Sequence, residues 1–328
     1  MTLEIAQSKI GSDLAVSSES RVASLTEKLL GMFRERHVTR CGLLLDPVLR
    51  DARPQLASRQ MECGGQPLSS VPVRVAPGLI DKSHWPVFVE VDLETLSGRQ
   101  LITDSLTMAL ADWDVDSRRK GLGHRICAWT ASSLRMTEVA AGLPAQLVHR
   151  RPDGRRSLLR FYDPAVTAQA WRLCTTVQQQ QLLGPIDCWI SMGAHGDFRS
   201  YEGNGAGLVK GSTTVVPEFS SEQWRRLDQI GPINRALARL PVDPEDGAMG
   251  PVADALLRAQ GYGFMNLEDL AEFAWRAFTV SPWFDSHPRI KQCITTRNAG
   301  DSFGYATADL TETHWSVIAM EANAGRPQ

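Results

Sequence analysis

Residues 157–164 are Ser-Leu-Leu-Arg-Phe-Tyr-Asp-Pro, a short apolar run directly followed by an Asp-Pro pair. Asp is favoured immediately before a helix, where its carboxylate accepts hydrogen bonds from backbone N–H groups that have no partner within the helix. Pro fits the first helical turn, because no N–H donor is needed there. This stretch therefore predicts a strand up to Tyr162, a cap at Asp163 and a helix from Pro164.

The same unit of apolar run, polar residue and helical pattern recurs on both sides of this stretch. Further apolar runs lie at residues 41–45, 87–91, 126–130 and 186–190. Strands that alternate with helices predict an α/β fold with a largely parallel sheet. Residues 148–162, with Pro152-Asp-Gly154 in their middle, predict a hairpin instead. We therefore expect a mixed, partly parallel sheet with flanking helices.

The chain changes character beyond the last of these runs. Residues 203–207, Gly-Asn-Gly-Ala-Gly, predict a flexible connection, and Gly231-Pro232 predicts a break between two helices of the region that follows. Ser220 and Gln223 have the spacing of a capping box at the start of the first of these helices. We expect a flexible tail at 1–20, an α/β lobe at 21–200, a linker at 201–219 and a mainly helical lobe at 220–328.

Composition narrows the classes of partner. The net charge of −2, with 22% charged and 43% hydrophobic residues, is ordinary for a globular protein and gives no electrostatic reason to expect nucleic acid or an anionic membrane. We find no window near the roughly 18 apolar residues of a membrane span and no apolar signal segment. The six cysteines have no zinc spacing. We expect a cytoplasmic protein without a cofactor.

Three carboxylates follow apolar runs: Asp46, Asp92 and Asp163. The carboxyl ends of parallel strands meet at one edge of a sheet, and three acids there would suit Mg²⁺. Asp before a helix is also an ordinary cap, and Asp46-Pro47 and Asp163-Pro164 fit that role better. A metal-dependent hydrolase or phosphotransfer enzyme that uses these carboxylates is the alternative function.

Other candidates for chemistry are weak. Residues 112–116, Asp-Trp-Asp-Val-Asp, copy the start of a calcium loop, but Ser117 and Gly123 replace the Gly and Glu that such a loop requires. We find no pair of histidines with the spacing of a zinc helix and no nucleophile elbow. We therefore expect no catalytic residues, and a protein that is not an enzyme.

Nine tryptophans are the unusual feature of the composition. Trp129, Trp189 and Trp275 lie within apolar patterns and are expected in the core. Trp224, with Arg225 and Arg226 directly after it, has the composition of a protein-binding hot spot. Trp283 also lies near a helix end. These four residues, Trp224, Arg225, Arg226 and Trp283, are the candidate partner-binding residues.

The stretch 157–164, followed by Gln180, Leu183-Gly184-Pro185 and Trp189, resembles the type VI secretion effector adaptor family. These proteins are encoded beside the valine–glycine repeat spike protein and its toxic effector. Residues 87–91 and 259–270 are similar to further parts of the family's pattern. The resemblance covers roughly residues 40–295 and is strongest at 157–189.

The resemblance implies an adaptor or chaperone without catalytic residues or cofactor. Such a protein binds an effector near its N-terminal region and docks it on the C-terminal region of the spike. We expect the motif residues to build the fold, with Arg160 paired to a carboxylate and Asp163 as a helix cap. These residues are Arg160, Phe161, Tyr162, Asp163, Pro164, Gly184, Pro185 and Trp189. The partner surface is then expected on the helical lobe, where different cargoes need different shapes.

Overall fold

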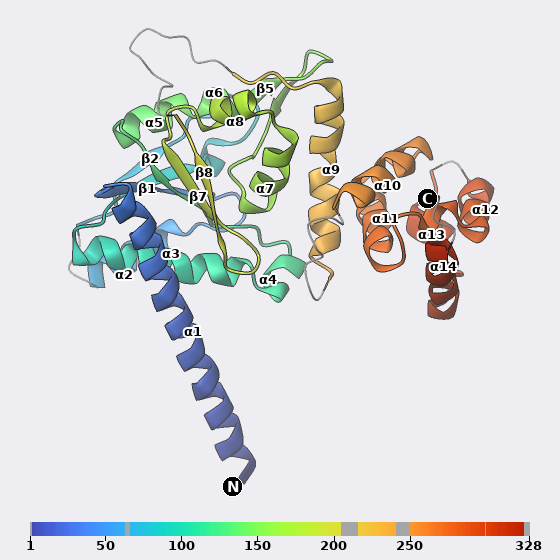
Figure 1. Cartoon of the computed structure of the whole chain (residues 1–328), viewed down its shortest axis with the longest axis horizontal. Coiled ribbons are helices and arrows are strands. Elements are labelled where there is room, and N and C mark those ends of the chain that lie inside the picture. The colour runs from blue at the N-terminus through green and yellow to red at the C-terminus, as the bar shows by residue number, and fades with distance from the viewer. Residues whose placement is uncertain (1, 63–65, 205–215, 241–248, 299, 325–328) are drawn as a thin grey trace. The chain divides into compact units, whose positions relative to one another are not determined.

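The structure is a computed structural model that describes residues 2–62, 66–204, 216–240, 249–298 and 300–324 (Figure 1). It divides into two compact units, one of residues 1–117 and 122–219 and one of residues 118–121 and 220–328. The division between residues 219 and 220 falls where the predicted linker ends.

The first unit holds all the described strands and the helices up to α8. The strands of its main sheet are β1 (Arg40–Leu45), β2 (Ser70–Pro72), β3 (Val87–Asp92), β4 (Ile126–Ala131), β7 (Cys188–Met192) and β8 (Phe198–Glu202). The helices are α1 (Thr2–Glu35), α2 (Arg53–Glu62), α3 (Leu96–Asp112), α4 (Val115–Arg119), α5 (Met136–Gly142), α6 (Pro144–Leu147), α7 (Pro164–Leu173) and α8 (Thr176–Leu183), with the short 3-10 helix η1 (Lys82–His84). Only α4 extends past the division between the units.

The main sheet has the strand order β2-β3-β1-β4-β7-β8, and its described strand pairs are antiparallel. The predicted α/β class is therefore confirmed, but the expected parallel pairing is wrong. The physical reason is the position of β1. Strands β3 and β4 do run in the same direction around helix α3, as alternation predicts, but β1 lies between them and pairs antiparallel with both.

The predicted hairpin is present as β5 (Val148–Arg150) and β6 (Arg156–Leu158), with the Pro152-Asp-Gly154 turn between them. Gly154 has a φ of 83°, which only Gly adopts without strain. Strand β6 ends at Leu158 and not at Tyr162 as predicted. Leu159 still donates a backbone hydrogen bond to Leu147, and the Arg-Phe-Tyr-Asp segment then turns into helix α7.

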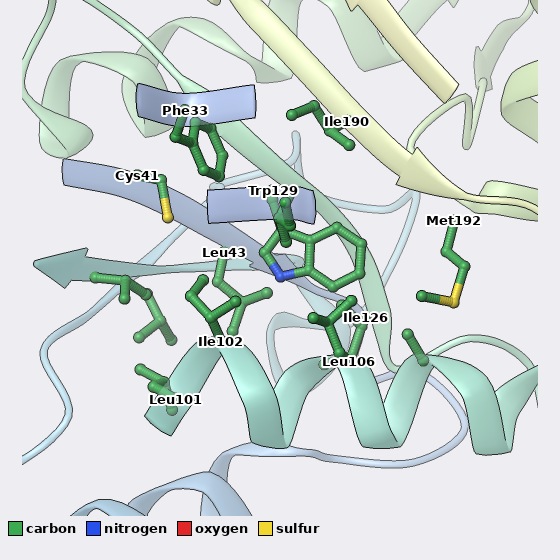
Figure 2. Close-up of a cluster of buried hydrophobic side chains, with 14 of the residues drawn as sticks. Phe33, Cys41, Leu43, Leu101, Ile102, Leu106, Ile126, Trp129, Ile190 and Met192 are labelled. Atoms are coloured by element: carbon green, nitrogen blue, oxygen red, sulfur yellow. The ribbon is translucent and has the colours of Figure 1, made fainter. Parts of the chain in front are cut away.

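The core of the sheet is continuous and apolar. All residues of β4 are buried, as are five of the six in β1. Side chains from α1 and α3 pack with those of β1, β4 and β7 around Trp129 (Figure 2). Trp129 is 1% exposed, and its Nε1 donates to Ser105 Oγ at 2.9 Å, so the one polar atom of the indole has a partner. Trp129 is a core residue, as predicted.

The N-terminal segment differs from the prediction. Helix α1 begins at Thr2, so the residues expected to form a flexible tail are helical. Residues 1–20 contain no Pro and a single Gly, and an established helix extends at low cost through such a sequence. The other end of α1 follows the predicted helical spacing, because Leu25, Leu29 and Phe33 are buried in the sheet core.

The described ends of the predicted linker belong to the first unit. Tyr201 and Glu202 are part of β8, so the linker cannot begin at residue 201. At the other end, Gln178 Nε2 donates to the Glu218 carbonyl at 2.6 Å, and His149 Nδ1 lies 3.3 Å from the Pro217 carbonyl. The Gly-rich residues 205–207 lie outside the described residues.

The second unit is mainly helical, as predicted. Its elements are α9 (Ser221–Leu237), α10 (Met249–Gly261), α11 (Leu267–Thr279), η4 (Phe284–Ser286), α12 (Pro288–Thr296), α13 (Phe303–Ala306) and α14 (Glu312–Ala324). Ser220 forms the predicted capping box with Gln223. The predicted break at Pro232 is wrong, because α9 continues through it. Phe264, Phe273, Phe284 and Phe303 form the aromatic centre of this unit. Within the described ranges, none of the helices has the length and apolar character needed to cross a membrane.

Candidate functional site

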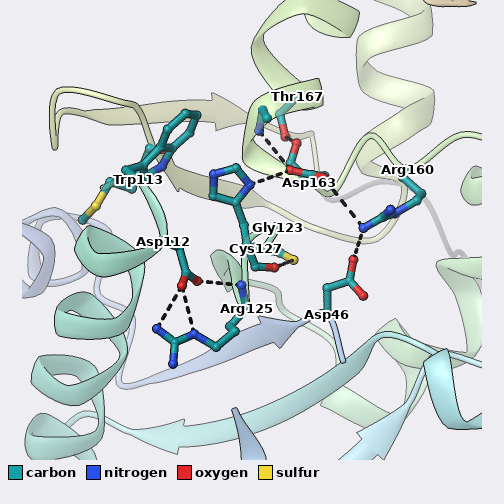
Figure 3. A network of polar contacts seen from close by, with 12 residues as sticks. Asp46, Asp112, Trp113, Gly123, Arg125, Cys127, Arg160, Asp163 and Thr167 are labelled. Carbon is teal, nitrogen blue, oxygen red and sulfur yellow. Dashed lines mark hydrogen bonds and ion pairs between the residues drawn. The ribbon is translucent and has the colours of Figure 1, made fainter. Parts of the chain in front are cut away.

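The segment from Arg160 to Pro164 leads directly into helix α7 (Figure 3). Asp163 Oδ1 accepts a hydrogen bond from the Ala165 backbone N–H at 3.1 Å, and Pro164 occupies the first helical position. Thr167 Oγ1 donates to the Asp163 carbonyl at 2.9 Å. Asp163 is therefore the helix cap that the sequence predicted.

Asp163 is also one member of a chain of ionisable groups. Its Oδ1 lies 3.0 Å from His124 Nδ1, and its Oδ2 lies 3.7 Å from Arg160 Nη2. Arg160 Nη2 in turn donates a hydrogen bond to Asp46 Oδ2. The predicted pairing of Arg160 with a carboxylate is confirmed. His124, Asp163, Arg160 and Asp46 therefore form one network. It connects Asp46 after β1 with His124 before β4 and with the segment that precedes α7.

Burial and charge act differently on the two carboxyl groups. Burial raises the pKa of Asp46, although the charge of Arg160 and a backbone hydrogen bond from Val48 oppose that shift. Burial also acts to raise the pKa of Asp163. The hydrogen bond and charge of His124, the charge of Arg160 and the Ala165 hydrogen bond outweigh burial and lower the pKa of Asp163. The network therefore stabilises a charged carboxylate at the helix start.

A second ion cluster lies beside the first at Asp112, whose side chain is fully buried. Arg50 Nη2 donates to Asp112 Oδ1 at 2.6 Å, and Arg125 donates to both oxygens, from Nε at 2.9 Å and from its backbone at 2.7 Å. Asp112 would be the first ligand of the calcium-like sequence. Because two guanidinium groups already occupy its carboxylate, the local geometry is that of an ion pair.

The three strand-end carboxylates do not converge. Asp92 is opposite Arg40 in the β1–β3 register, at the start of β1, whereas Asp46 follows the end of β1. Asp46 and Asp92 therefore lie at opposite ends of the paired strands β1 and β3, and only Asp46 and Asp163 meet around Arg160. Across the ranges that the structure describes, no group of three or more His, Cys, Asp and Glu could hold a metal ion. The arrangement on which the alternative enzyme depended is absent there.

The remaining motif residues form a second buried layer on the other side of the sheet from Trp129. Trp189 is fully buried, and its ring centroid lies 5.5 Å from that of Phe161. Gly184 ends α8 with a φ of 56°, and a Cβ there would lie 3.2 Å from the amide of Gln146. Pro185 presents its carbonyl to Ser132 Oγ at 2.6 Å. These contacts give Gly184, Pro185, Phe161 and Trp189 structural roles in the first unit.

Tyr162 lies under the guanidinium of Arg160. The Arg160 Cζ is 5.8 Å from the centroid of the Tyr162 ring, and Tyr162 is fully buried. Burial raises the pKa of its hydroxyl, so the phenol remains neutral at any physiological pH. Tyr162 therefore acts as an apolar support for the ion network.

The candidate partner-binding residues separate into two groups. Trp224 is only 4% exposed, so its prediction as a surface contact is wrong. It shares the buried stripe of α9 with Leu227 and Ile230, at a spacing of three residues. Arg225 and Arg226 are engaged in ion pairs with Glu222, and Arg226 also pairs with Asp254.

Trp283 is accessible, with 38% of its surface exposed. The Cζ of Arg258 lies 4.6 Å from the centroid of its ring. Arg258 is fixed by two hydrogen bonds to the buried carboxylate of Asp285, from Nε at 2.8 Å and from Nη2 at 2.7 Å, and Tyr262 Oη donates to the same carboxylate at 3.0 Å. Neither Arg258 nor Asp285 was predicted from the sequence as a functional residue. Arg258 is the single charged residue in residues 255–261 of α10, and an isolated charge of that kind is the signal that could have indicated a buried partner.

The fold and the network define a protein whose motif residues hold an antiparallel α/β unit together. Residues 73–181 match a family model described as Domain of unknown function (DUF4123), which covers about a third of the chain and includes Arg160–Pro164. This family is associated with effector adaptation in type VI secretion. No curated protein and no solved structure matches the chain.

Proposed function

We propose that this chain is an adaptor that binds a type VI secretion effector in the cytoplasm and loads it onto the spike protein. The function requires neither catalytic residues nor a cofactor. The effector is bound near its N-terminal region, and the complex docks on the C-terminal region of the spike. Nucleic acid and membrane are not partners in this proposal.

The observation that carries the proposal is the use of the Arg160–Pro164 segment. This segment lies inside the residues that match the family model, and it is the strongest part of the resemblance to effector adaptors. Its polar side chains make contacts within the protein: Asp163 caps α7, and Arg160 binds Asp46. A motif that builds the fold leaves the other surfaces of the protein to determine which partner it binds, as expected for a binding scaffold.

The second unit offers the surface chemistry for a protein partner. Its exposed large apolar side chains include two aromatic ones, and they are Met265, Leu267, Trp283, Tyr305, Val317 and Met320. Trp283 is the strongest of these, because Arg258 lies over its ring while 38% of its surface remains exposed. A rigid, partly exposed Trp beside an Arg is typical of the residues that dominate binding energy in protein interfaces.

The proposal is tested by co-expression. The tagged chain is produced with the toxin and spike proteins encoded beside it, purified by the tag and run on a sizing column. We expect the toxin to co-elute and to remain soluble. Elution of the chain alone, with the toxin equally soluble in its absence, would reject the adaptor function.

A further inference from the structure

The two edges of the main sheet differ in what they offer to another chain. Strand β2 at one edge has three residues and ends in Pro72, which has no backbone N–H to donate. Strand β8 at the other edge has five residues, Phe198–Glu202, and no Pro. An edge strand of this kind presents backbone donors and acceptors with the spacing of a β-ladder.

The hydrogen bonds at the two ends of the β7–β8 hairpin determine which groups of β8 point outward. Gly193 N donates to the Asp197 carbonyl at 2.8 Å, and Gly203 N donates to the Asp187 carbonyl at 2.8 Å. Bonded and non-bonded pairs alternate along an antiparallel ladder. Arg199 and Tyr201, opposite Ser191 and Trp189, are therefore the residues of β8 that bond to β7.

By the same alternation, Phe198, Ser200 and Glu202 direct their backbone N–H and C=O away from β7. The Glu202 carbonyl supports this direction, because it accepts a hydrogen bond from Gln180 Nε2 of α8 at 2.8 Å. In the part of the chain that the structure describes, no such partner meets the backbone groups of Phe198 and Ser200, and Ser200 is exposed. Among the described residues, the middle of this edge is therefore unpaired.

Side-chain contacts also fix the position of strand β8. Tyr201 packs on Trp171 of α7, with ring centroids 4.6 Å apart, and Phe198 meets Trp129 edge to face at 5.9 Å. Arg36, directly after the end of α1, forms an ion pair with Glu202 at 2.6 Å. Because β8 is fixed from both faces of the sheet, pairing with another strand costs little conformational entropy on this side.

We propose that an extended segment of the effector adds to the sheet at β8, with its backbone bonded to Phe198 and Ser200. This inference rests on the proposed adaptor function and names how the cargo is held. Only an extended backbone supplies donors and acceptors at the repeat that these two residues require. Only two outward-facing residues of β8 lack a backbone partner among the described residues, which is too few to hold two copies of this chain together without other contacts. It suits one part of a larger interface with a cargo.

A proline at position 200 tests the strand addition. Ser200→Pro removes the outward N–H, and it leaves the ladder intact because Ser200 does not bond to β7. Ser200→Ala is the matched control, because it keeps the backbone N–H. Both variants and the unmodified chain are co-expressed with the neighbouring toxin. We expect Ser200→Pro to lose the toxin and Ser200→Ala to retain it, with similar melting temperatures.

The outcomes separate the two proposals. Failure of the unmodified chain to hold the toxin rejects both the adaptor function and the strand addition. Retention of the toxin by a folded Ser200→Pro variant rejects the strand addition alone. A dimer of the unmodified chain that Ser200→Pro dissociates would identify a second copy as the occupant and overturn the assignment to the effector.

Hydrogen exchange on the unmodified chain provides a measurement that does not depend on the folding of a variant. We expect the amides of Phe198 and Ser200 to exchange more slowly in the toxin complex than in the free chain. The amides of Arg199 and Tyr201, which the ladder to β7 already protects, serve as the internal reference. Equal exchange of Phe198 and Ser200 in the free and bound chain would overturn the proposal.

Discussion

Arg160 and Asp46 lie 114 positions apart, and the guanidinium of Arg160 donates a hydrogen bond to the buried carboxylate of Asp46. Asp46 follows the central strand β1, and Arg160 precedes helix α7. The pair therefore fastens the helix that the motif starts to the middle of the sheet. It is the contact through which a local sequence pattern determines the tertiary arrangement of the first unit.

Removal of one partner of this pair leaves the other charge without compensation. We expect Arg160→Met to lower the free energy of unfolding by about 2 kcal/mol, below the usual cost for fully buried pairs because Arg160 is partly exposed. Asp46→Asn should have a similar effect. The double variant should lose less than the sum of the two, and urea unfolding of all four proteins measures that coupling. Additive losses would show that the pair does not act as a unit.

Replacement of the cap tests the role of Asp163 separately. Asp163→Ala should lower the free energy of unfolding by about 1 kcal/mol or more, because α7 loses its side-chain cap and His124 loses its partner. Asp163→Asn keeps a capping oxygen and should lose less. Thermal unfolding of the two variants in parallel is the measurement. Equal losses for Ala and Asn would mean that charge, and not the cap, is the dominant contribution.

The pH dependence of stability should contain a component from His149. Burial lowers the pKa of this side chain from its usual value of 6.5, so the unfolded chain takes up the proton more readily than the folded chain. The stability that neutral His149 contributes is therefore fully present above pH 6.5 and is lost as the pH falls from there toward the lower folded pKa.

Urea unfolding at a series of pH values between about 7.5 and 5.5 measures this component. His149→Gln should flatten the dependence in that window. The same slope in the unmodified chain and in His149→Gln would contradict the assignment.

Trp224 is expected to matter for folding and not for binding. Because it is 4% exposed in the buried stripe of α9, Trp224→Ala should lower the free energy of unfolding by about 3 kcal/mol. Arg225→Ala, one position further and exposed, should change it by less than about 0.5 kcal/mol. Chemical denaturation of both variants is the check, and similar stabilities would place Trp224 on the surface after all.

Trp283 should show the opposite behaviour. Trp283→Ala removes an exposed ring and its contact with Arg258, so we expect a stability loss of only about 1 kcal/mol. The amount of toxin that co-purifies should fall strongly. Leu96→Ala, at a more exposed apolar residue of the first unit, is the matched control and should bind normally. Normal toxin binding by Trp283→Ala would remove this residue from the interface.

The sequence predicted best what depends on neighbouring residues. The cap at Asp163, the capping box at Ser220 and the hairpin turn at Gly154 are each determined within a few positions, and each is present. Trp129 and Trp189 are buried, as the apolar residues around them in the sequence predict, whereas Trp275, predicted in the core on the same ground, is only partly buried.

What depends on distant residues was predicted less well. The alternation of strands and helices indicates a crossover from β3 to β4, but no local signal shows that β1 inserts between them and reverses the pairing. This single insertion also separates Asp92 from Asp46. Trp224 was assigned to the surface because two arginines follow it, although the spacing to Leu227 and Ile230 was the stronger signal for burial.

Assembly of the three proteins that the proposed function connects tests the adaptor role most directly. Purified chain, neighbouring toxin and spike are mixed in pairs and together, and each mixture is analysed by size exclusion with light scattering. We predict a ternary complex, and no stable complex of toxin and spike when this chain is absent. A toxin that binds the spike equally well without this chain would contradict the adaptor function.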